Sequence, residues 1–140
     1  GMRNPSEDHM MRTPYQIVAD HYAASDRHDP AAMMADIAPA IEWTEMAGFP
    51  CAGTYRSADE IVRNVFRRLG EEWDGYTFKL DALHDAGDTV IGVGRYSGTY
   101  RRTGKSFECR VAHVWRVDAG KIVHFEQFTD TLLVAQAMQP

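Results

Sequence analysis

The spacing of apolar residues changes along the chain, from a period near 3.6 residues in the first half to a period near two from residue 76 onward. Thr13 followed by Pro14 is typical of a helix start, and Tyr15, Val18 and Tyr22 recur on one stripe at helical spacing. The pattern therefore predicts an amphipathic helix directly after Pro14.

Two further helices are predicted before the period changes. Asp29 and Pro30 restart the helical pattern, which predicts a short helix over DPAAMMADI. Ser57 and Glu60 form a Ser-x-x-Glu capping box that opens a longer helix, and Gly70 is expected to end it. Between these helices, PAIEWTEM alternates as a first strand does, with Ile41, Trp43 and Glu45 on one side.

The second half of the chain predicts a meander of four strands, at about 76–85, 89–101, 106–117 and 121–131. The links DAGD, RTGK and DAGK are short and contain glycine, so successive strands should be antiparallel. Helices followed by such a meander indicate the α+β class, with one curved sheet wrapped around helices on its inner face.

The turns also predict which side chains share a face of the sheet. With Ala119 and Gly120 as a two-residue turn, Trp115 lies opposite His124 and His113 lies opposite Glu126. The predicted concave face carries Gly92, Gly94, Tyr96, Gly98, Tyr100, Phe107, Cys109, Val111, His113, Trp115, His124, Glu126, Phe128 and Asp130. The opposite face would expose Val93, Val114, Val123 and Phe125 together, which predicts a homodimer through the outer face.

Composition and charge narrow the functional classes. The chain has 140 residues, 44% of them hydrophobic, which suits one soluble globular domain over 14–140. We expect residues 1–13 to form a disordered arm in which Gly1 remains from a removed tag. The net charge of −5 disfavours nucleic acid as a partner. No apolar run reaches the roughly 18 residues of a membrane span. Two cysteines without metal-ligand spacing suit a reducing, cytoplasmic location.

The second half resembles a known family. The Gly-Thr-Tyr strand end, the TGK turn, AHVWRV, the DAGKIV turn and the closing QFTDT occur in the order found in the SnoaL-like group of the NTF2-like superfamily. GFPCAGTYRSADEI and the N-terminal helices match more loosely. The resemblance implies a cone-shaped α+β barrel, also called cystatin-like, with three helices of the N-terminal half packed in the concave face of a mostly antiparallel sheet.

The resemblance also implies a catalytic position. In the polyketide cyclases of this group, an aspartate near the end of the last strand acts as general base, and that position falls on Asp130. The related ketosteroid isomerases carry their base near the first strand, where this chain has Glu42 and Glu45 but no aspartate. The Asp-Arg-Asp set of the epoxide hydrolases is matched only by Asp130 with Arg95 or Arg110.

The sequence thus predicts a cofactor-independent acid–base enzyme that acts on a small hydrophobic carbonyl compound. Asp130 would remove a proton next to the carbonyl, and His113 would stabilise the enolate or return a proton. The predicted ligand-binding residues are Trp43, Tyr55, Tyr96, Tyr100, Trp115 and Phe128.

Two alternatives stay open. In a non-catalytic binding module, Asp130 would instead accept backbone hydrogen bonds at the strand end. The other alternative is a metal site formed by His113, His124 and Glu126, although no metal is predicted.

Overall fold

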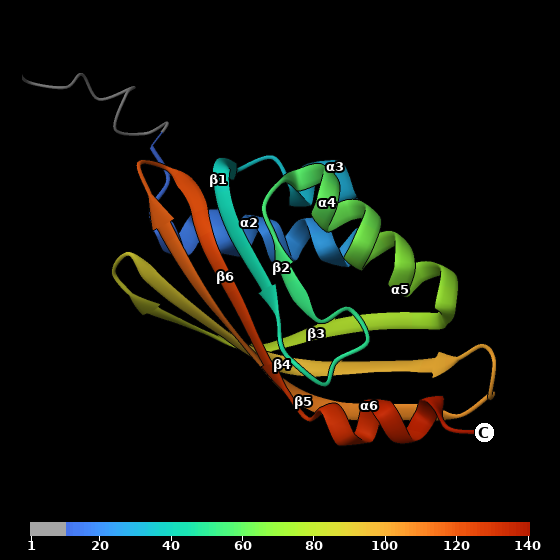
Figure 1. Cartoon of the computed structure of the whole chain (residues 1–140). Coiled ribbons are helices and arrows are strands. Elements are labelled where there is room, and N and C mark those ends of the chain that lie inside the picture. The colour runs from blue at the N-terminus through green and yellow to red at the C-terminus, as the bar shows by residue number, and fades with distance from the viewer. Residues whose placement is uncertain (1–10) are drawn as a thin grey trace, which may run out of the picture.

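The computed structural model describes residues 11–140, in which helices lie against the concave side of one curved sheet of six strands (Figure 1). The strand order is β2-β1-β6-β5-β4-β3. The predicted α+β class is therefore confirmed. Most of the predicted arm lies outside the described residues.

The strands of the second half are longer than the first ones. Their bounds are β1 Ile37–Glu45, β2 Gly53–Tyr55, β3 Trp73–Ala86, β4 Thr89–Tyr100, β5 Ser106–Asp118 and β6 Lys121–Thr129. All neighbouring pairs are antiparallel except β1 and β6, which run parallel. The four predicted meander strands are present, within three residues of the predicted bounds.

The first two helices begin where the sequence predicts. Helix α2 spans Pro14–Asp26, and the Thr13 side chain accepts from the backbone N–H of Gln16 while the Gln16 side chain accepts from the backbone N–H of Thr13. Helix α3 spans Pro30–Met33 and is capped by the Asp29 side chain. Both starts satisfy N–H groups that have no partner within a helix.

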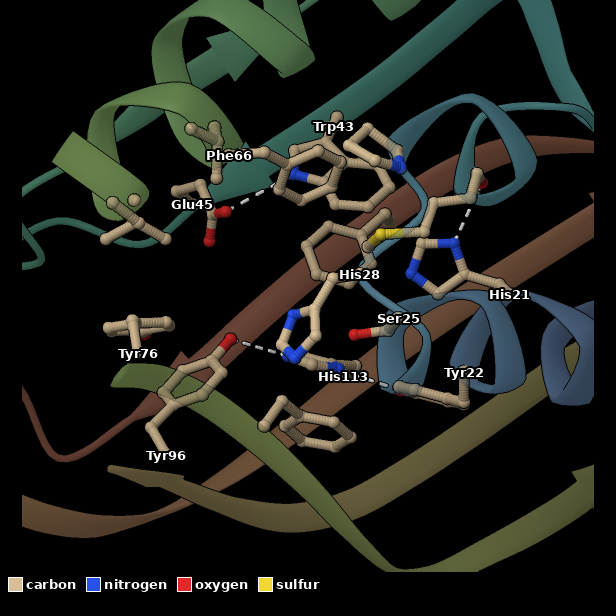
Figure 2. A pocket seen from close by; sticks show the side chains of 17 residues that line it. His21, Tyr22, Ser25, His28, Trp43, Glu45, Phe66, Tyr76, Tyr96 and His113 are labelled. Carbon is tan, nitrogen blue, oxygen red and sulfur yellow. Dashed lines mark hydrogen bonds between the residues drawn. The ribbon is translucent and has the colours of Figure 1, made fainter. Parts of the chain in front are cut away.

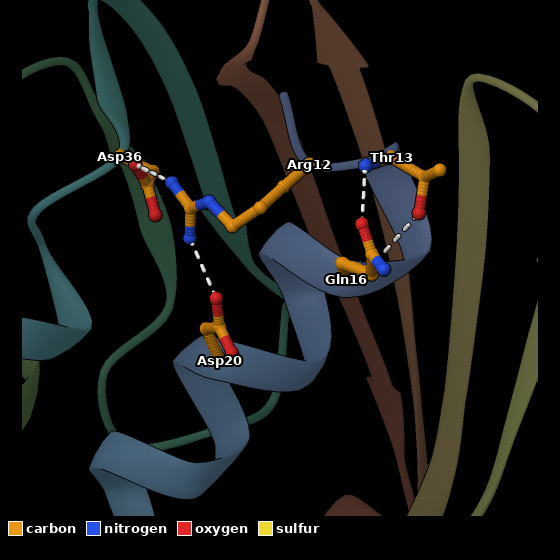
Figure 3. A network of polar contacts seen from close by, with 5 residues as sticks. All are labelled: Arg12, Thr13, Gln16, Asp20 and Asp36. Atoms are coloured by element: carbon orange, nitrogen blue, oxygen red, sulfur yellow. Dashed lines mark hydrogen bonds and ion pairs between the residues drawn. The ribbon is translucent and has the colours of Figure 1, made fainter. Parts of the chain in front are cut away.

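Just before α2, the guanidinium group of Arg12 joins two elements of the fold. It donates to Asp20 on α2 and to Asp36 ahead of β1, each at 2.7 Å (Figure 3). The chain is thereby attached to the domain from Arg12 onward, so the last two residues of the predicted arm, Arg12 and Thr13, belong to the ordered domain.

The third predicted helix is continuous but changes its winding. It runs through α4 (Ala58–Ile61), a π-helical turn η1 (Val62–Phe66) and α5 (Arg67–Glu72). Ser57 caps it as predicted, whereas the Glu60 carboxylate accepts from Arg56 rather than from Ser57. Gly70 does not end the helix, which continues for two more residues.

The predicted faces of the sheet hold on one side of β5 and fail on the other, although the predicted register is wrong on both sides. Gly92 pairs with His113 and Tyr96 with Cys109, a shift of two residues from the prediction that keeps each side chain on its predicted face. On β6, however, the pairing passes from Val117–Ile122 to Arg116–His124 and skips Val123. This β-bulge moves every later side chain of β6 to the opposite face.

Because of this bulge, the predicted faces of β6 are wrong beyond Val123. Phe125 is 2% exposed and stacks on Trp43 with 3.8 Å between ring centroids, so it belongs to the core and not to the outer face. Phe128, predicted to line the hollow, is 45% exposed on the outer face near Val93 and Ala112. His124 and Glu126 also leave the concave face.

Two of the glycines of β4, Gly92 and Gly94, leave room for aromatic side chains. A Cβ atom on Gly92 would overlap the hydroxyl group of Tyr22 from α2. A Cβ atom on Gly94 would come within 2.7 Å of the Phe78 ring from β3. These two positions let large rings approach the sheet closely.

The sequence analysis missed the last helix. Helix α6 spans Thr131–Met138 and buries Val134 and Ala137, three residues apart, against the end of the sheet (Figure 1). β6 accordingly ends at Thr129, and Asp130 is the N-cap of α6 rather than part of a strand. No helix among residues 11–140 is long and apolar enough to cross a bilayer.

Candidate active site

A cavity of about 240 Å³ lies between the helices and the concave face of the sheet. Its walls are mainly aromatic, with rings from β1, β3, β4, β6 and the long helix (Figure 2). Three exposed lining residues, His28, Pro30 and Gly70, place its mouth between the α2–α3 connection and α5. The π-helical turn η1 contributes Val65 and Phe66, and such turns are frequent at functional sites.

The acidic residue of the cavity is Glu45, the last residue of β1. It is 4% exposed, and its Oε1 atom accepts from the indole N–H of Trp43 at 3.4 Å. Its Oε2 atom is buried and has no hydrogen-bond partner within the described part of the chain. Burial disfavours the charged form and raises the pKa of Glu45 to about 8, although the Trp43 hydrogen bond opposes this rise.

A buried hydrogen-bond network crosses the floor of the cavity and centres on His113 of β5. The Tyr22 hydroxyl lies 2.8 Å from His113 Nδ1, and the Tyr96 hydroxyl lies 2.7 Å from His113 Nε2 (Figure 2). Trp115 Nε1 donates to Tyr22, and Gln127 Nε2 donates to Tyr96, each at 2.9 Å. The orientation of the Gln127 amide is set because its Oε1 accepts from the backbone N–H of Met46.

The proton count of this network leaves one hydroxyl hydrogen free. Burial lowers the pKa of His113 to about 3, so the imidazole is neutral at physiological pH and has one N–H and one acceptor nitrogen. One of Tyr22 and Tyr96 therefore donates to His113, and the other accepts from it. Each hydroxyl already accepts one N–H, so the tyrosine that accepts from His113 keeps its own hydrogen for another partner.

Four other polar residues line the cavity: His21, Ser25, His28 and Tyr76. The hydroxyl of Tyr76 on β3 is buried without a partner among residues 11–140. Its pKa is raised well above the ordinary value by burial and then by Tyr96 and Glu45, which places the three groups in one electrostatic environment. His21 donates through Nδ1 to the backbone oxygen of Met33 at 2.9 Å, and burial lowers its pKa to about 4. His21, His113 and Tyr76 are therefore uncharged at pH 7. Glu45 is mostly protonated at this pH, because its pKa is higher.

The structure places Asp130 away from the cavity. Its carboxylate is exposed and accepts from the backbone N–H of Leu133 at 3.2 Å, as the cap of α6. The predicted position on the concave face is wrong, because β6 ends one residue earlier and a helix comes next. Backbone capping is the arrangement that we expected if Asp130 were a structural residue.

The other predicted site residues divide into two groups. Trp43, Tyr96 and His113 line the cavity. Trp115 is fully buried behind it and acts through Tyr22, Tyr55 donates to the backbone oxygen of Cys51 at 2.7 Å, and Tyr100 packs with Trp73. Phe128 lies on the outer face. The alternative metal set is separated, since His124 and Glu126 face away from His113, and no group of three potential ligands is close enough to hold a metal within residues 11–140.

The sequence analysis missed several residues that line the cavity or support its hydrogen-bond network, although some carried a signal. Glu45 stands on the same side of its strand as Ile41 and Trp43, so the alternation already marked an acid on an apolar face. Tyr22 belonged to the predicted helical stripe. Gln127 carried no such signal, because only the bulge in β6 turns it inward.

Comparison with known proteins supports the fold. A model of the SnoaL-like domain matches residues 18–125. No curated protein sequence matches the chain. An NTF2-like protein of unknown function from Burkholderia pseudomallei is similar at 26% identity and a TM-score of 0.83, over 93% of this chain and 100% of that one.

Two similar structures contain small molecules. TerC, co-crystallised with polyporic acid, has 20% identity and a TM-score of 0.79, over 91% of this chain and 100% of its own. A protein with a ketosteroid isomerase-like fold from Catenulispora acidiphila, in complex with trimethylamine, has 20% identity and a TM-score of 0.74, over 92% of this chain and 96% of its own. At these identities the likeness concerns the fold alone. Since the family model covers most of the domain, the chain belongs to the SnoaL-like family of the NTF2-like superfamily.

Proposed function

We propose that this protein is a small acid–base enzyme in which Glu45 transfers a proton at the carbon next to a carbonyl group. The observation that carries the proposal is the Oε2 atom of Glu45, which is buried beside the cavity without a partner among the residues that the structure describes. A pKa of about 8 leaves roughly one tenth of the carboxyl groups ionised at pH 7. A base with a pKa near the working pH combines availability with proton affinity.

The negative charge that develops on the carbonyl oxygen requires a hydrogen-bond donor, and we assign this role to Tyr96. Tyr22 packs its hydroxyl against Gly92, whereas Tyr96 shares its electrostatic environment with Glu45. With the proton of His113 on Nε2, Tyr22 donates to Nδ1 and Tyr96 keeps its hydrogen for the substrate. Its raised pKa, due mainly to burial, keeps this phenol protonated.

Proton exchange tests the proposal without knowledge of the natural substrate. Small cyclic and aryl ketones in deuterated water should lose their α-hydrogen signals faster with the protein than without it. Glu45→Gln should slow this exchange at least about 100-fold, because general-base catalysis typically contributes that much. Asp130→Asn is the control and should stay within about twofold. Equal losses in both variants would contradict the assignment of Glu45.

The pH dependence adds a second check. Because the base must be ionised, the exchange rate per protein should rise with pH and level off above about pH 8. A binding module is the second candidate, favoured by the same carboxyl group in its protonated form, which is a hydrogen-bond donor. A binder should hold ketones most tightly below pH 8 and catalyse no exchange.

We also retain the homodimer through the outer sheet face as a proposal. It is supported by Phe128, which is 45% exposed beside the apolar residues Val93 and Ala112. Sedimentation at several concentrations tests it, and Phe128→Glu should shift the protein towards the monomer. The cytoplasmic location is likewise a proposal, consistent with the two buried, unpaired cysteines.

A further inference from the structure

The cavity contains more unsatisfied polar groups than the proposed proton transfer requires. Glu45 Oε2 and the Tyr76 hydroxyl are both buried without partners among residues 11–140. Figure 2 shows the side chains of Glu45 and Tyr76 on the same side of the cavity. Tyr76 has no part in the proton transfer proposed above. A buried hydroxyl without a hydrogen bond is unfavourable, so a ligand atom that pairs with Tyr76 gains more than it would at an exposed site.

The charge of the walls restricts the ligand. Among residues 11–140, no lysine or arginine lines the cavity, and its two buried histidines, His21 and His113, are neutral at physiological pH. The third histidine of the lining, His28, is exposed at the mouth. A carboxylate or phosphate held against the buried walls would have no cationic partner there, and an unpaired buried charge is strongly unfavourable. The walls therefore favour a neutral molecule.

The size and shape of the cavity restrict it further. An apolar cavity of about 150 Å³ holds benzene, and a water-sized group needs about 30 Å³. The volume of 240 Å³ therefore suits one ring with roughly three small substituents. The rings of Trp43, Phe78 and Phe125 among the lining residues offer flat surfaces to such a molecule.

We infer that the cavity selects a neutral, single-ring molecule with two oxygen functions: a carbonyl group that meets Tyr96 and Glu45, and a hydroxyl or second carbonyl that pairs with Tyr76. The assignment of the carbonyl group depends on the proposed function. The assignment of the second oxygen depends only on Tyr76. Hydroxy-substituted aryl ketones are the simplest probes of this class.

Binding to acetophenone and to the three ring isomers of hydroxyacetophenone, measured by NMR titration at pH 6.5, tests the inference. At least one isomer should bind about fivefold or more tightly than acetophenone, as one added buried hydrogen bond allows. Tyr76→Phe should abolish this preference and leave the affinity for acetophenone within about twofold. Tyr100→Phe, which removes a tyrosine hydroxyl outside the cavity lining, is the matched control and should keep the preference.

Three results would overturn the inference. The first is wild-type protein that binds no hydroxy isomer better than acetophenone, a readout that needs no variant. The second is a preference that survives Tyr76→Phe. The third is equal or tighter binding of hydroxybenzoate anions or trimethylammonium, which would show that the site takes charged ligands.

The test also separates this inference from the proposed function. If the methyl hydrogens of acetophenone exchange in a way that depends on Glu45, but no binding preference depends on Tyr76, the proposed enzyme activity stands and the pairing of a second ligand oxygen with Tyr76 is wrong. If the binding preference is found without any exchange, the proposed ligand class stands and the proton transfer is wrong.

Discussion

Glu45 and Asp130 lie at the same end of the neighbouring parallel strands β1 and β6, yet their carboxyl groups are in opposite environments. Glu45 closes β1 on the inner face, 4% exposed and with one oxygen atom unpaired. Asp130 comes directly after β6 in solvent and caps a helix. The side chains differ by one methylene group, so the difference comes from the face of the sheet and from the element next in the chain.

The comparison shows that a strand-end acid is not by itself evidence for a catalytic base. An acid followed by a helix has a structural task, because the first N–H groups of that helix need an acceptor. An acid on an inner face has no such task, and its burial has a cost that the fold must offset. The second kind is the better candidate for chemistry.

The largest expected effect concerns the stability of the Glu45→Gln variant. The pKa of Glu45 is about 8 in the folded protein and near 4.5 when unfolded, so the folded state binds more protons between these values. Wild-type stability should therefore decrease as pH rises from about 4.5 to 8. Glutamine has no charge to bury, so Glu45→Gln should gain up to roughly 3–5 kcal/mol near pH 8 and almost nothing below pH 4.5.

Urea denaturation at several pH values measures this difference. Asp130→Asn serves as the control and should follow the wild-type curve within about 0.5 kcal/mol, because asparagine caps helices as well as aspartate does. A gain for Glu45→Gln that does not change with pH would mean that Glu45 is not a buried, protonated acid.

A smaller effect is expected at the second acid. Asp130→Ala removes the acceptor for the N–H of Leu133 and should cost about 1 kcal/mol in the free energy of unfolding. Ketone binding and proton exchange should be unchanged, because Asp130 does not line the cavity. If Asp130→Ala lost proton exchange while its stability stayed normal, Asp130 would be the better candidate for the catalytic base.

The smallest effect tests how Trp43 influences Glu45. Trp43→Phe removes the indole N–H that donates to Oε1, a bond of 3.4 Å that favours the charged form of the carboxyl group. The pKa of Glu45 should rise further, by a small amount consistent with so long a hydrogen bond. Carbonyl-carbon NMR of the carboxyl group measures it, and a fall in the pKa would contradict the assigned role of this bond.

The sequence predicted the helices and strands well because their signals are local. The Thr13 cap, the Ser57 cap and the change of period near residue 76 each depend on neighbouring residues only. The position of Asp130 depended on two features without such signals, the end of β6 and the start of α6. The alternation of β1 placed Glu45 on an apolar face, whereas the resemblance to the cyclases implied a base near the end of the last strand.

The bulge at Val123 has a consequence for how this fold changes its chemistry. If Val123 paired with Arg116 instead of being skipped, every later residue of β6 would shift by one position, and Glu126 would lie opposite His113 in place of Gln127. A carboxylate would then replace the amide that now donates to Tyr96. Loss of the bulge, or one residue inserted between Val123 and Glu126, would thus exchange one functional group of the hydrogen-bond network for another without any substitution. Deletion of Val123 would instead remove the bulge and leave Gln127 in place. A change of strand register can therefore alter the chemistry of such a pocket as a substitution does.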